Sequence, residues 1–147
     1  MSAAKAQLRL GEVLIESGHI TEEQLKQSLS LQRSSPDKKR LGTVMIENSI
    51  ISEERLNAAL ARRLNIRYVS ISESPIDMEA VKKIPRAVAT KHSLIAVAFN
   101  QQGALRVSIS DPLNYYAIED VKLITGMQLE IQISDESEIE SAIKEAY

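Results

Sequence analysis

The phrase Arg-Leu-Gly occurs twice in a chain of 147 residues that has only five glycines. The first opens the stretch RLGEVLIESGHITEEQL at Arg9, and the second opens RLGTVMIENSIISEERL at Arg40, 31 residues later. An arginine presents a rigid fork of N–H donors that suits a phosphate or the acceptor edge of a guanine. A glycine within a helix costs roughly 0.5–1 kcal/mol relative to alanine, so the two retained glycines suggest that some group approaches the backbone closely there.

The two phrases belong to an internal duplication. Residues 9–32 and 40–63 are identical at 11 of 24 aligned positions, far more than chance gives. A duplicated motif has two simple explanations, which are economy of structure and a ligand that itself has two equivalent halves.

Each copy is predicted to form a helix, a tight turn and a second helix. In the first copy Gly18 stands where a left-handed cap would end the first helix. Thr21 and Gln24 have the spacing of a capping box at the start of the second helix, and Ser52 repeats the capping residue in the second copy. The entry of each second helix is therefore specified by its own sequence.

One face of each second helix carries an apolar stripe that ends in a polar group. The stripe comprises Leu25, Leu29 and Gln32 in the first copy and Leu56, Leu60 and Arg63 in the second. Such a face can line a pocket that needs an apolar wall and one directional contact. The alternative is that these leucines only hold a four-helix cluster together, because apolar stripes at helical spacing usually form a core.

The pattern changes after Leu64 to short strands and helices. Strands are expected over 66–71, 93–99, 104–110 and 128–134, and helices over 77–84, 114–124 and 136–146. The predicted fold class is α+β: residues 1–66 form a four-helix unit from the duplicated motif, and residues 67–147 form a small α/β subdomain with a short sheet covered by helices.

The composition argues against several classes of function. The chain has no cysteine, which excludes disulfides and thiolate metal sites and fits a cytoplasmic location. Its longest apolar run, residues 94–99, is too short to cross a bilayer. His19 and His92 lack partners at metal-binding spacing, and no phosphate-binding loop for ATP is present. We therefore expect neither an enzyme nor a metal or cofactor site.

The charges are unevenly distributed along the chain. Residues 1–67 carry 11 basic and 8 acidic side chains, whereas residues 68–147 carry 7 and 12. An anionic ligand is therefore expected in the first part.

The duplicated motif resembles that of the MshEN domain, which opens the assembly ATPases of type IV pili and the ATPases of type II secretion. In many members this domain binds cyclic di-GMP. Carried over position by position, the resemblance implies ligand-binding residues Arg9, Leu10, Gly11, Leu14, Gly18, Leu25, Leu29 and Gln32 in the first copy. In the second copy it implies Arg40, Leu41, Gly42, Met45, Leu56, Leu60 and Arg63.

The second copy departs from the motif at two positions. Ser49 stands where the motif has Gly, and Arg63 stands where it has Gln. If the turn at residue 49 needs a positive φ, serine is less favourable there than glycine, whereas a guanidinium can still contact guanine as an amide does.

The resemblance implies a regulatory domain that binds cyclic di-GMP through both motifs, with the ATPase motor beyond Tyr147. The same family also suggests an alternative, a nucleotide-free docking module that holds the ATPase to an assembly partner at the inner membrane. In both cases the domain would be cytoplasmic and would reach the membrane only through partners.

Overall fold

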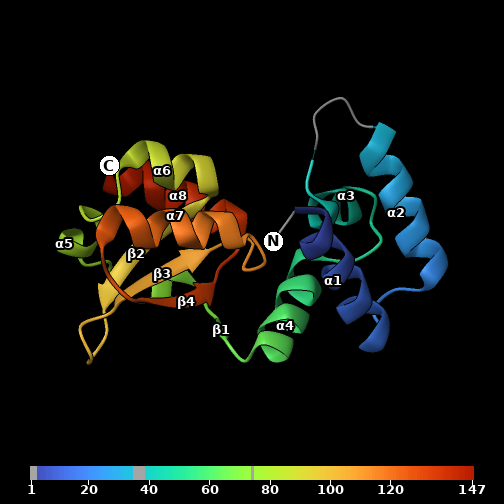
Figure 1. Cartoon of the computed structure of the whole chain (residues 1–147), viewed down its shortest axis with the longest axis horizontal. Coiled ribbons are helices and arrows are strands. Elements are labelled where there is room, and N and C mark those ends of the chain that lie inside the picture. Colours follow the sequence, from blue (N-terminus) through green and yellow to red (C-terminus); the bar gives the residue numbers. More distant parts are fainter. Residues whose placement is uncertain (1–2, 35–38, 74) are drawn as a thin grey trace. The chain divides into compact units, whose positions relative to one another are not determined.

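The computed structural model describes residues 3–34, 39–73 and 75–147, with side chains from Leu10 onward. Contacts divide the chain into two compact units, Met1–Leu64 and Asn65–Tyr147, which are called unit 1 and unit 2 (Figure 1).

Unit 1 is helical, and each copy of the motif supplies one pair of helices. The helices are α1 (Ala3–Glu16), α2 (Glu22–Ser34), α3 (Leu41–Glu47) and α4 (Glu53–Leu64). Helix α1 packs against α4 and α2 packs against α3, so the two copies share one core. Leu14, Leu41 and Met45 are almost completely buried in this core, with 0%, 1% and 0% of their surface exposed. The predicted four-helix unit is confirmed.

The predicted caps fix the entry of each second helix. The Thr21 backbone N–H donates to Gln24 Oε1 at 2.9 Å, and the Gln24 N–H donates to Thr21 Oγ1 at 3.1 Å. In the second copy the Arg55 N–H donates to Ser52 Oγ at 3.2 Å. The first copy thus has the complete capping box, and the second keeps its capping hydroxyl.

Unit 2 contains a sheet of order β1-β4-β3-β2. Its strands are β1 (Arg67–Tyr68), β2 (Leu94–Phe99), β3 (Leu105–Ile109) and β4 (Leu129–Ile133). Strands β2 and β3 form an antiparallel hairpin, whereas β4 pairs in parallel with both β3 and β1. Leu105, Val107 and Ile109 are fully buried, which places the centre of the core at β3.

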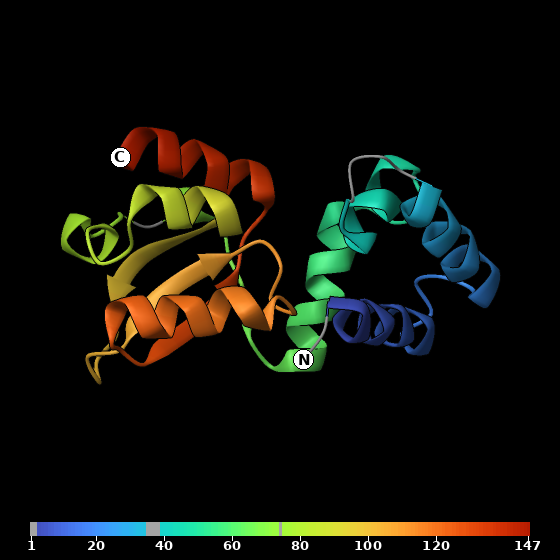
Figure 2. The same cartoon turned by 45° about the horizontal axis from the view of Figure 1, so that its top comes forward.

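Helices cover this sheet, as the predicted fold class requires. They are α5 (Met78–Val81), α6 (Arg86–His92), α7 (Tyr115–Thr125) and α8 (Glu136–Ala146), with a 3-10 turn at Ile71–Glu73. Helices α6 and α8 lie side by side and both pack against β2 (Figure 2). Ala117 and Val121 of α7 join the same buried cluster. The α+β prediction is confirmed.

Unit 2 departs from the local predictions in two places. The strand expected over residues 66–71 is only the two-residue β1, because its pairing with β4 stops at Tyr68 and the backbone turns at Ile71. Helix α6 was not expected. It begins directly after Pro85 without a side-chain cap and ends at Ser93 in a left-handed conformation, with φ 52°.

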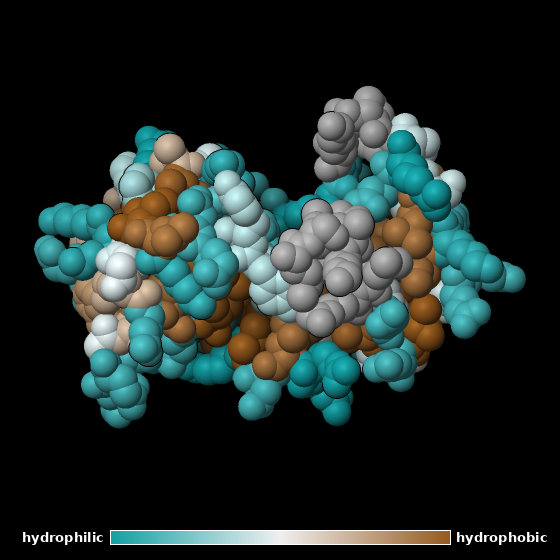
Figure 3. Space-filling model, in the orientation of Figure 1, coloured by the Kyte–Doolittle hydropathy of each residue, from teal (hydrophilic) through white to brown (hydrophobic). Residues whose placement is uncertain are grey.

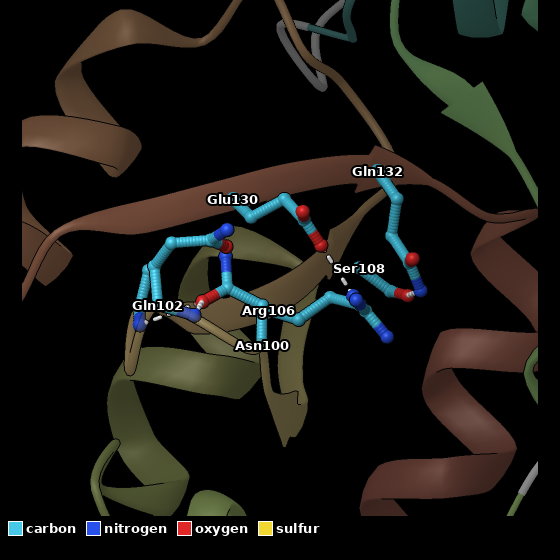
Figure 4. Close-up of polar contacts among 7 residues, drawn as sticks. Asn100, Gln102, Arg106, Ser108, Glu130 and Gln132 are labelled. Carbon is cyan, nitrogen blue, oxygen red and sulfur yellow. Dashed lines mark hydrogen bonds and ion pairs between the residues drawn. The ribbon is translucent and has the colours of Figure 1, made fainter.

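Polar side chains link β3 to β4. Figure 4 shows Arg106 and Glu130 pointing toward each other from paired positions of the two strands. The hydrogen bond from the Arg106 guanidinium is the main cause that lowers the pKa of Glu130. The stabilisation from this pair is therefore present above the unfolded-state pKa of Glu130 and is lost as the pH falls through the folded-state pKa. Nearby, Gln132 Nε2 donates to Ser108 Oγ at 2.6 Å in the buried part of the sheet.

The exposed large apolar side chains among the described residues all belong to unit 2: Met78, Tyr116, Leu123 and Ile124. Figure 3 shows a mainly hydrophilic face with scattered apolar patches. Tyr116 and Leu123 of α7 are 67% and 83% exposed. No helix among the described residues is both long and apolar enough to span a membrane.

Candidate functional site

The two Arg-Leu-Gly phrases occupy different helical positions in unit 1. Arg9 lies within α1, although its side chain is outside the described residues. Arg40 is the N-cap residue of α3, with φ −66° and ψ 150°, and its side chain is half-buried. The first phrase therefore runs along a helix, whereas the second begins one.

The close approach expected at both glycines is present, and the approaching group is a leucine of the same repeat. A Cβ on Gly11 would lie 2.6 Å from Leu25 Cδ1, and a Cβ on Gly42 would lie 3.0 Å from Leu56 Cδ2. These glycine–leucine pairs are equivalent in the duplication. Each glycine therefore leaves room for the end of a leucine side chain from the second helix of its own copy, and this contact alone gives both glycines a structural role.

The turns after α1 and α3 are also equivalent and require a left-handed residue. Gly18 has φ 76° and Ser49 has φ 57°. The Gly18 and Ser49 N–H groups donate to Ile15 O and Ile46 O at 3.0 and 3.1 Å, which satisfies carbonyls at the helix ends. The conditional expectation for Ser49 is thus met: serine occupies a conformation that favours glycine.

This difference predicts opposite effects for two reciprocal substitutions. Ser49→Gly should stabilise the chain by roughly 0.5–1 kcal/mol, because the left-handed strain on serine exceeds the backbone entropy cost of glycine. Gly18→Ser should destabilise it by a similar amount, since a Cβ there meets no atom within 4 Å and only strain changes. Urea unfolding of both variants measures these free energies.

Ser30→Gly is the matched control, because Ser30 lies within α2 at an ordinary helical conformation. It should destabilise the chain by roughly 0.5–1 kcal/mol. If Ser49→Gly destabilises the chain as Ser30→Gly does, the turn carries no strain.

Gln32 has a structural partner that sequence reasoning did not reveal. Its Nε2 donates to the Lys39 backbone carbonyl at 2.9 Å, which ties the end of α2 to the residue before Arg40. The Lys39 ammonium in turn pairs with Glu47 at 2.8 Å. No spacing rule predicts a bond from a side-chain amide to a carbonyl seven residues away. The contact helps to fix where the second arginine enters α3.

The predicted ligand-binding residues differ in how far they can be reached from solvent. Buried members are Leu10, Gly11, Leu14, Leu41, Met45, Leu56 and Leu60. Half-buried members are Leu25, Leu29, Gln32, Arg40 and Gly42, and exposed members are Gly18 and Arg63. The buried leucines and Met45 pack the helical core, as the alternative interpretation of the stripes requires. Contact of any of these residues with a ligand stays a prediction.

The stripe expected on α4 is not a single surface. Leu56 and Leu60 are only 6% and 3% exposed, whereas Arg63 is exposed. The expectation that all three side chains share a ligand-facing surface must be corrected, because the leucines face the core. Arg63 remains available to solvent.

The histidines and carboxylates do not form a metal site in the part of the chain that the structure describes. His92 is buried, and its Nε2 lies 3.0 Å from Asp120 Oδ2. The His92 ring also contacts Tyr116 edge to face, with centroids 5.9 Å apart. His92 thus joins α6 to α7 and has a structural role.

Comparison with known proteins found a relative that matches nearly all of the chain. The type IV pilus assembly ATPase PilB of Myxococcus xanthus (strain DK1622) is 29% identical over 140 residues, which are 95% of this chain and 24% of PilB. The chain thus spans about a quarter of that relative.

Two solved structures have the same fold over nearly all of the chain. The structure of MshE with cdg (cyclic di-GMP) is 27% identical, with a TM-score of 0.81 and coverage of 94% of this chain and 98% of that one. The N-terminal domain of XpsE is 25% identical, with a TM-score of 0.76 and coverage of 95% and 94%.

The family assignment comes from the second part of the chain. Residues 64–147 match the MshEN domain. This match lies outside the duplicated motif and covers more than half of the chain. The chain belongs to the MshEN domain family.

Proposed function

We propose that this chain is the N-terminal regulatory domain of a type IV pilus assembly or type II secretion ATPase and that it binds cyclic di-GMP through its two tandem motifs. The observation that carries the proposal is the likeness to MshE with cdg over 94% of the chain. The likeness to PilB supports an attached ATPase motor elsewhere in a longer protein.

The duplicated motif supports this ligand on chemical grounds. Cyclic di-GMP is two-fold symmetric, and two copies of one helical motif can offer each half an equivalent surface, as protein symmetry matches a palindromic operator. Arg9 and Arg40 would supply forked donors to phosphate or guanine. Residues 1–66 would then form the ligand-binding subdomain, with residues 67–147 as a separate α/β subdomain.

The supporting contacts in unit 1 favour a site that is formed before the ligand binds. The Gln32 bond to Lys39 and the capping position of Arg40 hold the second phrase at the start of α3. The reciprocal capping box at Thr21 and Gln24 fixes the first copy. Such preorganisation lowers the entropy cost of binding.

A second candidate function is nucleotide-free docking to an assembly partner at the inner membrane. Two observations favour it: the departures at Ser49 and Arg63, and the burial of the apolar residues in the stripes. Under this function the motif only maintains the four-helix core. In both cases the domain would work in the cytoplasm and approach the membrane through partners.

Calorimetric titration with cyclic di-GMP separates the two functions. We expect one ligand per chain, because two motif copies offer two half-sites. The adenine analogue should bind more weakly, since adenine replaces the guanine O6 acceptor with an amino donor. A stoichiometry of two ligands per chain would contradict the shared site, and no heat at high micromolar ligand would favour docking.

A further inference from the structure

Helix α8 borders a groove in unit 2 that the proposed nucleotide site does not use. One hollow of about 410 Å³ is lined by Tyr68, Ser70, Asp135 and Glu138, among others. A second, of about 670 Å³, continues along α8 past Glu138 to Glu145. Glu138 lines both hollows, and the second one, which holds both Glu138 and Glu145, is called the α8 groove (α8 is red in Figure 2).

Five apolar and five polar residues line the α8 groove, and three of the apolar ones come from residues 71–78. Ile71 and Ala142 are buried beneath it, while Ile76 is half-buried and Met78 is 47% exposed. Methionine is flexible and polarisable, and it often serves at surfaces that adapt to a partner. The groove therefore offers an apolar contact that is open to solvent.

The helix that borders the α8 groove is strongly acidic. Residues 135–147 carry five carboxylate side chains and a single lysine. Glu138 accepts a hydrogen bond from Ser70 Oγ, whereas Glu145 has no hydrogen-bond or ion-pair partner among the described residues. The two glutamates are two helical turns apart, or about 10 Å at a rise of about 1.5 Å per residue. Acidic groups therefore stand at both ends of the apolar stretch.

We propose that the α8 groove binds one amphipathic helix of another protein, with basic residues at positions i and i+7 and apolar residues at i+3 and i+4. The basic pair would match the spacing of Glu138 and Glu145, and the apolar pair would contact Met78 and Ile76. Helices docked in grooves are recognised through anchors at this spacing, and complementary charge sets their orientation.

A synthetic alanine-rich helical peptide with Lys at i and i+7 and Leu at i+3 and i+4 tests the proposal. Fluorescence anisotropy of the labelled peptide with the 147-residue chain should show saturable binding that weakens as salt rises. Glu145→Gln should weaken it about two- to fivefold, as expected for an exposed ion pair. Met78→Ala should weaken it about three- to tenfold through lost apolar contact.

Glu140→Gln is the matched control, because Glu140 is exposed on α8 but does not line the groove. It should leave peptide binding unchanged, and all three variants should retain the parent's response to cyclic di-GMP. The proposal would be overturned if the peptide showed no saturable binding, or if Glu140→Gln lowered peptide affinity as much as Glu145→Gln does. It would also be overturned if a peptide with Glu in place of Lys bound equally well. Self-association that Glu145→Gln abolishes, measured by sedimentation, would also overturn it by assigning the groove to a second copy.

Discussion

Arg40→Ala should weaken binding of cyclic di-GMP by about ten- to a hundredfold, because charge-assisted hydrogen bonds are worth about 1.5–3 kcal/mol. Arg40 caps α3, and its half-buried side chain projects from the start of the second motif. The Gln32 bond to Lys39 holds the preceding residue, so the arginine is presented from a fixed backbone. Calorimetry of the variant measures the loss.

The loss must come from binding and not from unfolding. Thermal unfolding should show that Arg40→Ala keeps most of its stability, since half-exposed arginines seldom carry a core. Arg33→Ala is the matched control: Arg33 is an exposed arginine of unit 1 outside the motif. Arg9→Ala should behave as Arg40→Ala does. Parent-like affinity in both motif variants would make the Arg-Leu-Gly phrase purely structural.

Gly11→Val should destabilise the chain by about 2 kcal/mol, a typical cost of overpacking. A Cβ at this position would lie 2.6 Å from Leu25 Cδ1 and 3.3 Å from Leu25 Cγ, so the whole end of that side chain must move. The gain in helix propensity over glycine offsets only part of this cost. Urea unfolding measures the free energy.

The duplication provides both a control and a rescue for Gly11→Val. Gly42→Val should cost less, because its Cβ would meet Leu56 at 3.0 Å instead of 2.6 Å. The double variant Gly11→Val with Leu25→Ala should lose roughly 1 kcal/mol less free energy of unfolding than the two single variants lose together, because the two residues are in direct contact. Simple additivity of the two changes would show that the clash with Leu25 is not the cause.

The elements that could be predicted from sequence are those specified by local signals. Helix α8 spans Glu136–Ala146, the predicted range, because its periodicity and acidic first turn are both local. Helix α7 lies in the range predicted from residue 114 and is bounded by local signals: Asn114 Oδ1 accepts from the Ala117 N–H at 3.1 Å, and the helix ends at Gly126 with φ 64°. Local signals therefore sufficed for these helices.

Elements that depend on distant partners or unusual residues could not be predicted. Strand β1 exists only through pairing of Arg67 and Tyr68 with residues 132 and 133. Helix α6 ends at Ser93, which has a left-handed conformation usually taken by glycine. The Ser93 Oγ is buried without a hydrogen-bond partner among the described residues. Neither feature leaves a recognisable pattern nearby in the chain.

The candidate site was predictable only in part for the same reason. The repeat spacing located both glycines and both turns, and it anticipated a close approach to the glycine backbone. It did not identify Leu25 and Leu56 as the groups that approach, nor the bond from Gln32 to Lys39. Those contacts depend on how helices pack in three dimensions, which helical periodicity alone does not determine.

The most direct test of a shared two-motif site is an amide NMR titration of the isotope-labelled chain with cyclic di-GMP. We predict that amide signals near Gly11 and Gly42 shift together, with the same dissociation constant and with saturation at one ligand per chain. Shifts confined to one copy of the motif, or to unit 2, would contradict binding through both motifs.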